Sequence, residues 1–188
     1  MIKANISDKQ LIVDILADSF QENQSVNFII KQDKRKATRI RALMDYSFEI
    51  CSLFGEVYLS DNKKGCALII YPDKKRTTLR SIYLDLKLTI KCLGIKNLFK
   101  AISRESMITK QHPNDLMYYL WFIGVSAENQ HSGIGSSLLQ DVINEGNKQK
   151  RAVCLETSTL KNIPWYQHFG FEIYQEIDLG YKLFFLKI

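Results

Sequence analysis

Apolar residues in the first part of the chain recur at helical spacing. A short strand is expected at Ile2–Asn5, followed by a helix from Ser7, a typical N-cap residue, to about Asn23. A second helix is expected over Lys36–Phe54, where the helical spacing returns, and Gly55 follows at the place of a C-terminal cap. The apolar residues of each helix share one face: Leu11, Ile15, Leu16 and Phe20 in the first, and Ile40, Leu43, Met44, Phe48 and Cys51 in the second.

A hairpin and two more helices are predicted next. Glu56–Ser60 and Cys66–Tyr71 are short runs of strand-forming residues that flank a polar stretch ending in Gly65. Beyond Pro72 the spacing is helical again on both sides of Gly94. Two amphipathic stripes follow: Leu79, Ile82, Tyr83, Leu86, Ile90 and Leu93 in the first helix, and Leu98, Phe99 and Ile102 in the second.

The strongest strand signal is Leu116–Val125, which is apolar almost throughout, as in a strand buried on both faces. The elements expected after it are a helix over Ser132–Asn147, a strand over Ala152–Thr157, a helix over Ile163–His168, and paired strands over Phe171–Ile177 and Tyr181–Leu186. This order predicts an α/β (α+β) fold with a partly parallel sheet and helices on both faces. The length of 188 residues suits a single domain, 1–188.

Charge is concentrated in one segment. Asp73–His112 holds ten Lys or Arg residues against three acidic ones, which gives 10 − 3 = +7, whereas the whole chain carries +6. A solvated helix face, a surface for anionic lipid or nucleic acid, and an entrance for an anionic acceptor all fit this excess. No nucleic-acid partner is expected, because no motif that reads RNA or DNA is present.

Several classes of protein are disfavoured by what the sequence lacks. The four cysteines, Cys51, Cys66, Cys92 and Cys154, form no C-x-x-C pair and have no histidines at ligand spacing, so we expect no metal site. No signal peptide and no membrane span are predicted. We therefore expect reduced thiols and a cytoplasmic location.

The segment Gln130-His131-Ser132-Gly133-Ile134-Gly135-Ser136 lies between the apolar strand and the following helix. Its glycines let the backbone approach a ligand, and the free N–H groups of the helix start suit a pyrophosphate. The alternative is that Gly133 and Gly135 serve only a tight turn. A dinucleotide fold would place Gly or Ala where Leu138 stands, and the nucleotide P-loop motif is absent.

Gln130, Gly133 and Gly135 match each specified position of the [RQ]-x-x-G-x-[GA] motif of the GCN5-related N-acetyltransferases (GNAT). Downstream, Asn162, Tyr166, Gly170 and Phe171 resemble a second signature of that family. The chain therefore resembles a GNAT protein over most of its length. A basic helical insertion at about 73–114 stands outside the usual core of the family.

This resemblance implies a mixed, twisted, partly parallel sheet of about seven strands, splayed between strands 4 and 5. It implies acetyl-CoA as co-substrate, with its pyrophosphate on residues 130–136 and its pantetheine arm along the main chain of Ile123, Gly124 and Val125. Asn162 would also hold the pantetheine. Tyr166 would act as general acid toward the thiolate, and the N–H of Ile123 or of its neighbour would hold the oxyanion. Core packing remains the alternative role for Gly124 and Tyr166.

The function implied is transfer of an acetyl group to a primary amine of a small acceptor, by direct attack in a ternary complex. The alternative is a catalytically silent CoA-binding sensor or partner-binding module. Four residues remain candidates for the general base: Glu56, His112, Asp115 and Glu156. The sequence leaves the acceptor unnamed and leaves both a monomer and a homodimer open.

Overall fold

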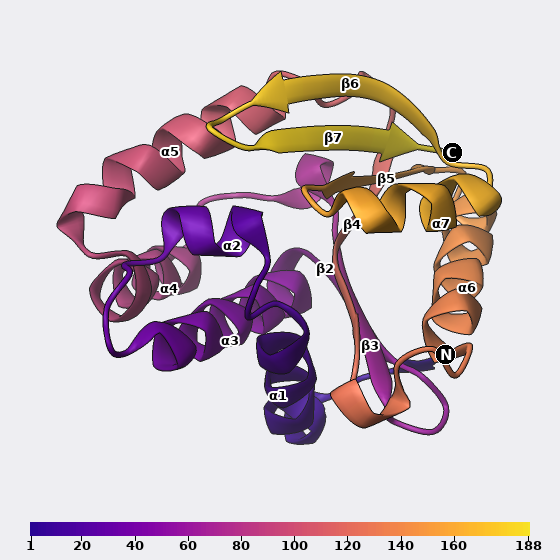
Figure 1. Ribbon diagram of the computed structural model, residues 1–188, viewed down its shortest axis with the longest axis horizontal. Coiled ribbons are helices and arrows are strands. Elements are labelled where there is room, and N and C mark those ends of the chain that lie inside the picture. The colour runs from indigo at the N-terminus through magenta and orange to yellow at the C-terminus, as the bar shows by residue number, and fades with distance from the viewer.

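The computed structural model describes the backbone of residues 1–188 and the side chains of all of them except 95 and 96. In this part of the chain the strands form one seven-stranded sheet in the order β1-β2-β3-β4-β5-β7-β6 (Figure 1). The strands are β1 (Ile2–Lys3), β2 (Gly55–Leu59), β3 (Gly65–Ile70), β4 (Met117–Val125), β5 (Ala152–Thr157), β6 (Glu172–Asp178) and β7 (Lys182–Lys187). The pair β4–β5 is parallel and the other pairs are antiparallel, so the predicted fold class is confirmed.

Helices cover both faces of the sheet (Figure 1). On one face lie α6 (Ile134–Lys148) and α7 (Ile163–His168). The other face is covered by α1 (Lys9–Ser19), α2 (Gln24–Ile29), α3 (Lys36–Phe54), α4 (Leu79–Leu88), the π-helical turn η3 (Thr89–Leu93) and α5 (Ile95–Thr109). The two faces therefore have separate cores, with the backbone of β4 between them.

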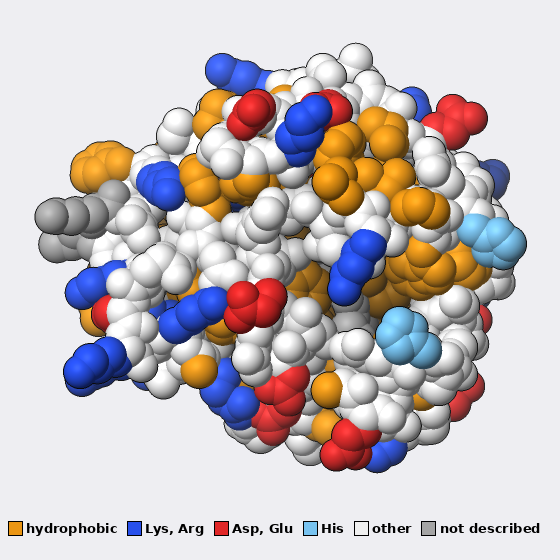
Figure 2. Space-filling view, in the orientation of Figure 1, with side chains coloured by type: hydrophobic (Ala, Val, Ile, Leu, Met, Phe, Trp, Pro, Cys, Tyr) orange, Lys and Arg blue, Asp and Glu red, His pale blue; other side chains and the backbone are white. Residues whose placement is uncertain are grey.

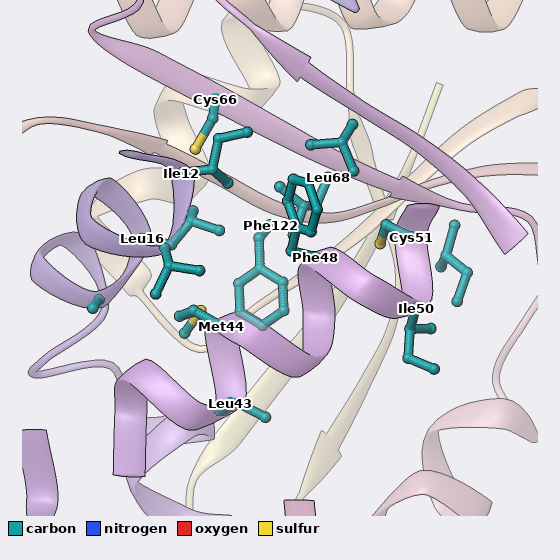
Figure 3. Packing of buried hydrophobic residues seen from close by; sticks show 14 of the residues in the cluster. Ile12, Leu16, Leu43, Met44, Phe48, Ile50, Cys51, Cys66, Leu68 and Phe122 are labelled. Carbon is teal, nitrogen blue, oxygen red and sulfur yellow. The ribbon is translucent and has the colours of Figure 1, made fainter. Parts of the chain in front are cut away.

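The larger core lies between the sheet and α1 and α3, and Figure 3 shows how their side chains interlock. Leu16 of α1 and Met44 of α3 are fully buried there, and they pack in the same cluster as Phe122 of β4. Phe20 meets the ring of Phe122 edge-on, with the centroids 5.1 Å apart. These contacts fix the C-terminal end of α1 against the C-terminal half of β4.

Three sequence-based expectations are corrected. Ser7 is not the N-cap of the first helix, because a capping box between Asn5 and Asp8 makes a short 3-10 turn first and α1 begins at Lys9. Helix α2 was not expected, since it has only six residues and a single buried one, Val26. The stripe Leu79–Ile90 faces solvent, because α4 and η3 pack inward instead through Ser81, Leu84, Leu88 and Cys92.

Candidate functional site

The ladder between β4 and β5 ends before either strand does. It pairs Met117 with Ala152 and extends to Leu120 opposite Leu155, whereas β4 continues to Val125 and β5 continues to Thr157. On its other edge β4 stays paired with β3 as far as Val125. One edge of β4 is therefore released over its last residues, as a splay between strands 4 and 5 requires.

A bulge lies at the point where the two strands separate. In the β3–β4 ladder, Leu68 pairs with Phe122 and Ile69 pairs with Leu120, so Trp121 has no partner on β3. The extra residue bends the strand and shifts the direction of the groups that follow it. Trp121 and Phe122 consequently pack on the same face of the sheet.

Backbone groups at the end of β4 divide between its two edges. The N–H of Ser126 donates to the carbonyl of Lys64 at 2.9 Å, so the backbone groups of Ser126 face β3. The carbonyl of Gly65 points away from β4, because it accepts from the N–H of Ser60. Because successive residues point to opposite edges, Ile123 and Val125 direct their N–H groups toward the splay. The carbonyl of Val125 accepts from Ser19 Oγ at 3.0 Å.

Gly124 has a different role from its two neighbours. By the same alternation its backbone groups face β3, where it pairs with Cys66. A Cβ at this position would lie 3.0 Å from Leu16 Cδ2 and 3.0 Å from Ser19 Oγ. The structure thus accounts for this glycine by the close packing of α1, and leaves only Ile123 and Val125 with groups on the open edge.

The loop that follows β4 begins with a 3-10 turn, η4 (Ala127–Asn129), and leaves Gln130 exposed. His131 takes a positive φ of 62°, and Gly133, which caps α6, has a φ of 83°. An added Cβ at position 133 would meet nothing within 4 Å, so crowding does not require a glycine there. The left-handed backbone conformation is what favours glycine at this position. Ser132 Oγ fastens the loop by donating to the carbonyl of Asn129 at 2.5 Å.

Five successive backbone N–H groups, those of residues 132–136, have no acceptor among the described residues. The first bonded N–H is that of Ser137, which donates to the carbonyl of Gly133 at 3.0 Å. A Cβ on Gly135 would make ordinary contacts, 3.6 Å from Val125 and 3.8 Å from Trp165, so the fold alone does not require glycine there. Free N–H groups at the positive end of a 15-residue helix are suited to a phosphate-bearing ligand.

Helix α7 lies beside the start of α6. Trp165 Nε1 donates to Ser136 Oγ at 3.1 Å and so links the two helices. Tyr166 is 6% exposed and packs against the rings of Trp165 and Phe171 at centroid distances of 4.8 and 5.8 Å. No described residue binds its hydroxyl, and burial raises the pKa of this phenol, so Tyr166 stays protonated near neutral pH.

The remaining residues of the second motif divide between structure and site. Gly170 has a φ of 90° where the chain leaves α7, and Phe171 is fully buried, so both serve the fold. Asn162 ends the short 3-10 turn η5 (Leu160–Asn162), and its half-buried side chain has no hydrogen-bond partner among the described residues. Figure 2 shows a hollow with an apolar floor on this face of the molecule, below α7 and above the loop that leads into α6.

Aromatic residues of β4 point to both faces of the sheet. Tyr118 is fully buried on the α6 side, within 3.5 Å of the Tyr58 hydroxyl. Tyr119 and Trp121 lie on the opposite side with α1 and α3. Only the latter two can border an acceptor on that face.

Glu56, one of the four candidates for the base, is held in a structural network. Its Oε2 accepts hydrogen bonds from Tyr58 at 2.6 Å and Tyr71 at 2.8 Å. Partial burial opposes ionisation, but the bonds from Tyr58, Tyr71 and Lys3 outweigh it and hold the pKa of this carboxyl below its usual value. Asp115 is exposed at the start of β4 and has no hydrogen bond to a described side chain.

His112 and Glu156 are brought together on the face opposite α6. His112 Nε2 lies 3.4 Å from Glu156 Oε1, and the two side chains are only 14% and 8% exposed. The His112 ring also packs on Tyr119 at 5.3 Å. Nearby on this face, Arg104 of α5 donates to the Tyr181 hydroxyl at 2.9 Å, a contact that no sequence motif indicated.

Other features bear on the kind of site. Within the described residues no group of three or more His, Cys, Asp or Glu side chains can hold a metal ion, and the four cysteines are free and buried. Among the helices that the structure describes, none has the length and apolar character needed to cross a membrane.

Comparison with known sequences finds matches in the second half of the chain. Residues 100–173 match the family described as Acetyltransferase (GNAT) domain. An uncharacterised N-acetyltransferase of Schizosaccharomyces pombe is 36% identical over 66 residues, which are 35% of this chain and 27% of that protein. The matched part is thus about a quarter of the yeast relative.

Solved structures share the fold over nearly the whole chain. A structure of histone acetyltransferase HPA2 and related acetyltransferase from Corynebacterium glutamicum aligns with a TM-score of 0.70 and 20% identity, covering 99% of this chain and 93% of that one. Arylalkylamine N-acetyltransferase 2 from Aedes aegypti aligns with a TM-score of 0.61 and 13% identity, covering 99% and 95%. The C-terminal condensation domain of Ebony, in complex with beta-alanyl-dopamine, aligns with a TM-score of 0.72 and 9% identity, covering 100% of this chain and 96% of that one. The sequence match over residues 100–173, the shared fold and the arrangement of β4, its loop and α6 together confirm the resemblance to the GNAT acetyltransferases that the two motifs indicated.

Proposed function

We propose that this protein transfers an acetyl group from acetyl-CoA to the primary amine of a small acceptor, in a ternary complex without a covalent enzyme intermediate. The observation that carries the proposal is the row of free N–H groups at residues 132–136 beside the released edge of β4. One feature suits a pyrophosphate and the other suits an extended amide-bearing chain. Their adjacency is what a CoA thioester needs.

The residues present fit this donor. The N–H groups from Ser132 to Ser136 would bind the pyrophosphate, and Gln130 would add its exposed side-chain amide. Ile123 and Val125 would pair with the pantetheine arm as a further strand, and the free amide of Asn162 is available to the same arm. Acetyl-CoA supplies the activated thioester, whose C–S bond breaks as the new C–N bond forms.

Tyr166 would donate the proton that the departing sulfur requires. Its ring is fixed by Trp165 and Phe171, and its hydroxyl has no other described partner. Because burial raises its pKa, the phenol is protonated over the whole neutral range. The N–H of Ile123, on the open edge, would stabilise the negative charge that develops on the carbonyl oxygen.

The proton lost by the amine would pass to the pair His112 and Glu156. Of the four candidates, these two are mutually in contact, shielded from solvent and on the side of the sheet opposite α6 and α7. Glu56 is already bonded by tyrosines, and Asp115 is exposed. Acid and base would thus act from opposite faces of the splay, as direct attack requires.

The first experiment separates donor binding from turnover. Calorimetry with CoA should show one site per chain. A panel of polyamines, amino acids, arylalkylamines, aminoglycosides and peptide amines should then give thiol release with acetyl-CoA for at least one acceptor. Binding without turnover of any amine would favour a silent CoA sensor, and absence of CoA binding would overturn the proposal.

A further inference from the structure

The outer face of α4 and η3 carries an apolar stripe that nothing in the described part of the chain covers. Its side chains range from half to almost completely exposed, with Leu79 at 88% and Ile90 at 69%. The stripe consists of Leu79, Ile82, Tyr83, Leu86 and Ile90. Spacings of three and four residues put these side chains on one side of a helix that turns about 100° per residue.

The stripe is not core that has been left incomplete. The same helix already packs inward through a second face, formed by Ser81, Leu84, Leu88 and Cys92. Thr78 caps its N-terminus by accepting from the N–H of Ser81, so the helix is held in place without the outer residues. Five large apolar residues on one exposed face exceed the scattered single exposures that are normal on a soluble surface.

Basic residues run along one side of the stripe. Arg80, Lys87 and Lys91 follow each other at helical spacing, and Lys74, Lys75 and Arg76 precede the helix. Over residues 73–91 the balance is six basic against two acidic, or 6 − 2 = +4. Arg80 and Lys87 are paired with Glu49 and Asp45 of α3, whereas Arg76 and Lys91 are exposed and form no ion pair with a described residue.

We propose that this face, Leu79–Lys91, lies flat on an anionic phospholipid surface, with the stripe in the interfacial layer and the exposed cations Arg76 and Lys91 at the headgroups. An apolar face with a cationic border is the pattern of helices that bind in the plane of a membrane. Long Lys and Arg side chains reach headgroups while their stems stay in apolar surroundings. The enzyme would thereby act at a membrane surface without spanning it.

Charge distinguishes this partner from two others. A second copy of the chain, docked about a twofold axis, would bring this cationic segment against itself, and like charges oppose such a contact. A nucleic acid would complement the charge, but phosphate contacts do not cover an apolar stripe. An anionic bilayer complements both features at once.

The test is sedimentation of the full chain with vesicles. We expect binding to vesicles that contain phosphatidylglycerol, weakened by salt, and at least tenfold weaker binding to pure phosphatidylcholine. The triple variant Leu79→Gln, Leu86→Gln and Ile90→Gln keeps the charge and should bind at least tenfold more weakly. Ile6→Gln is the matched control, because Ile6 is 69% exposed, as Ile90 is, and lies outside this face.

Two outcomes would overturn the proposal. One is equal binding of the triple variant and the control to anionic vesicles. The other is a concentration-dependent dimer, seen by light scattering, that the triple variant abolishes while neither protein binds vesicles. Far-ultraviolet circular dichroism and the CoA affinity of each variant show whether the fold is kept, so the result does not depend on the proposed acetyl transfer.

Discussion

The loop that leads into α6 and the outer face of α4 both expose groups that a folded protein usually satisfies, but the groups are of opposite kinds. The loop presents backbone N–H donors at residues 132–136, and α4 presents apolar side chains from Leu79 to Ile90. Unbonded N–H groups at a helix start are suited to a small anion, which needs only a few donors. An apolar stripe with a basic border is suited to an extended surface instead.

The difference shows how the two regions can be separated by experiment. The unbonded groups of the loop are backbone atoms, so side-chain changes there would act mainly through charge and shape. The face of α4 is built from side chains alone, so substitutions such as the triple variant remove its apolar groups directly. If the two regions are independent, each variant should alter one property and leave the other unchanged.

The largest effect is expected from Tyr166→Phe. The change removes one hydroxyl from a buried ring whose packing against Trp165 and Phe171 is kept. Loss of a general acid costs about 10²- to 10⁴-fold in kcat. CoA affinity by calorimetry and vesicle binding should not change, and kcat within twofold of the wild type would show that Tyr166 is a packing residue only.

A smaller loss of kcat is expected from Glu156→Gln, about 10- to 100-fold, because His112 remains as a partial base. Glutamine has nearly the same shape as glutamate, whose Oε1 lies 3.4 Å from His112 Nε2 in the wild type. The acidic limb of the pH profile should change as well as kcat, which a structural role alone would not produce. His112→Gln is the companion variant. If neither variant alters the pH profile, the base lies elsewhere.

Charge at the helix start is tested by Ser136→Asp, which should have opposite effects on two measurements. A carboxylate in the first turn of α6 complements the helix dipole and can still accept a hydrogen bond from Trp165 Nε1. The free energy of unfolding should therefore rise by about 0.3–1 kcal/mol. The same charge repels a pyrophosphate, and the affinity for CoA should fall about tenfold. Ser136→Asn is the neutral control and should keep most of the affinity. Unchanged CoA binding in Ser136→Asp would place the pyrophosphate away from α6.

The sequence predicts the loop before α6 better than it predicts the exposed face of α4, and the reason is physical. The loop could be predicted from local chemistry, since Gly133 has the left-handed conformation that favours glycine and Gln130–Gly135 lies between a strand and a helix. The pairing of His112 with Glu156 depends on α5 packing across the face of the sheet, where Ile108 contacts β7, and no local pattern encodes this. The exposed stripe was predicted as a helix face, but its orientation depends on Leu84 and Cys92 packing inward instead.

The smallest effect is expected at the cap of α4, and it tests whether the two regions are independent. Thr78 Oγ1 accepts from the N–H of Ser81, and Ser81 Oγ accepts in return from the N–H of Thr78 at 2.9 Å. Thr78→Ala removes half of this capping box and should cost about 1 kcal/mol of helix stability, whereas Thr78→Ser should cost little. Hydrogen exchange should quicken in α4, while exchange in α6 and the affinity for CoA stay at wild-type values. A matching loss of CoA affinity would mean that α4 supports the donor site, and the two regions would then have to be treated as one.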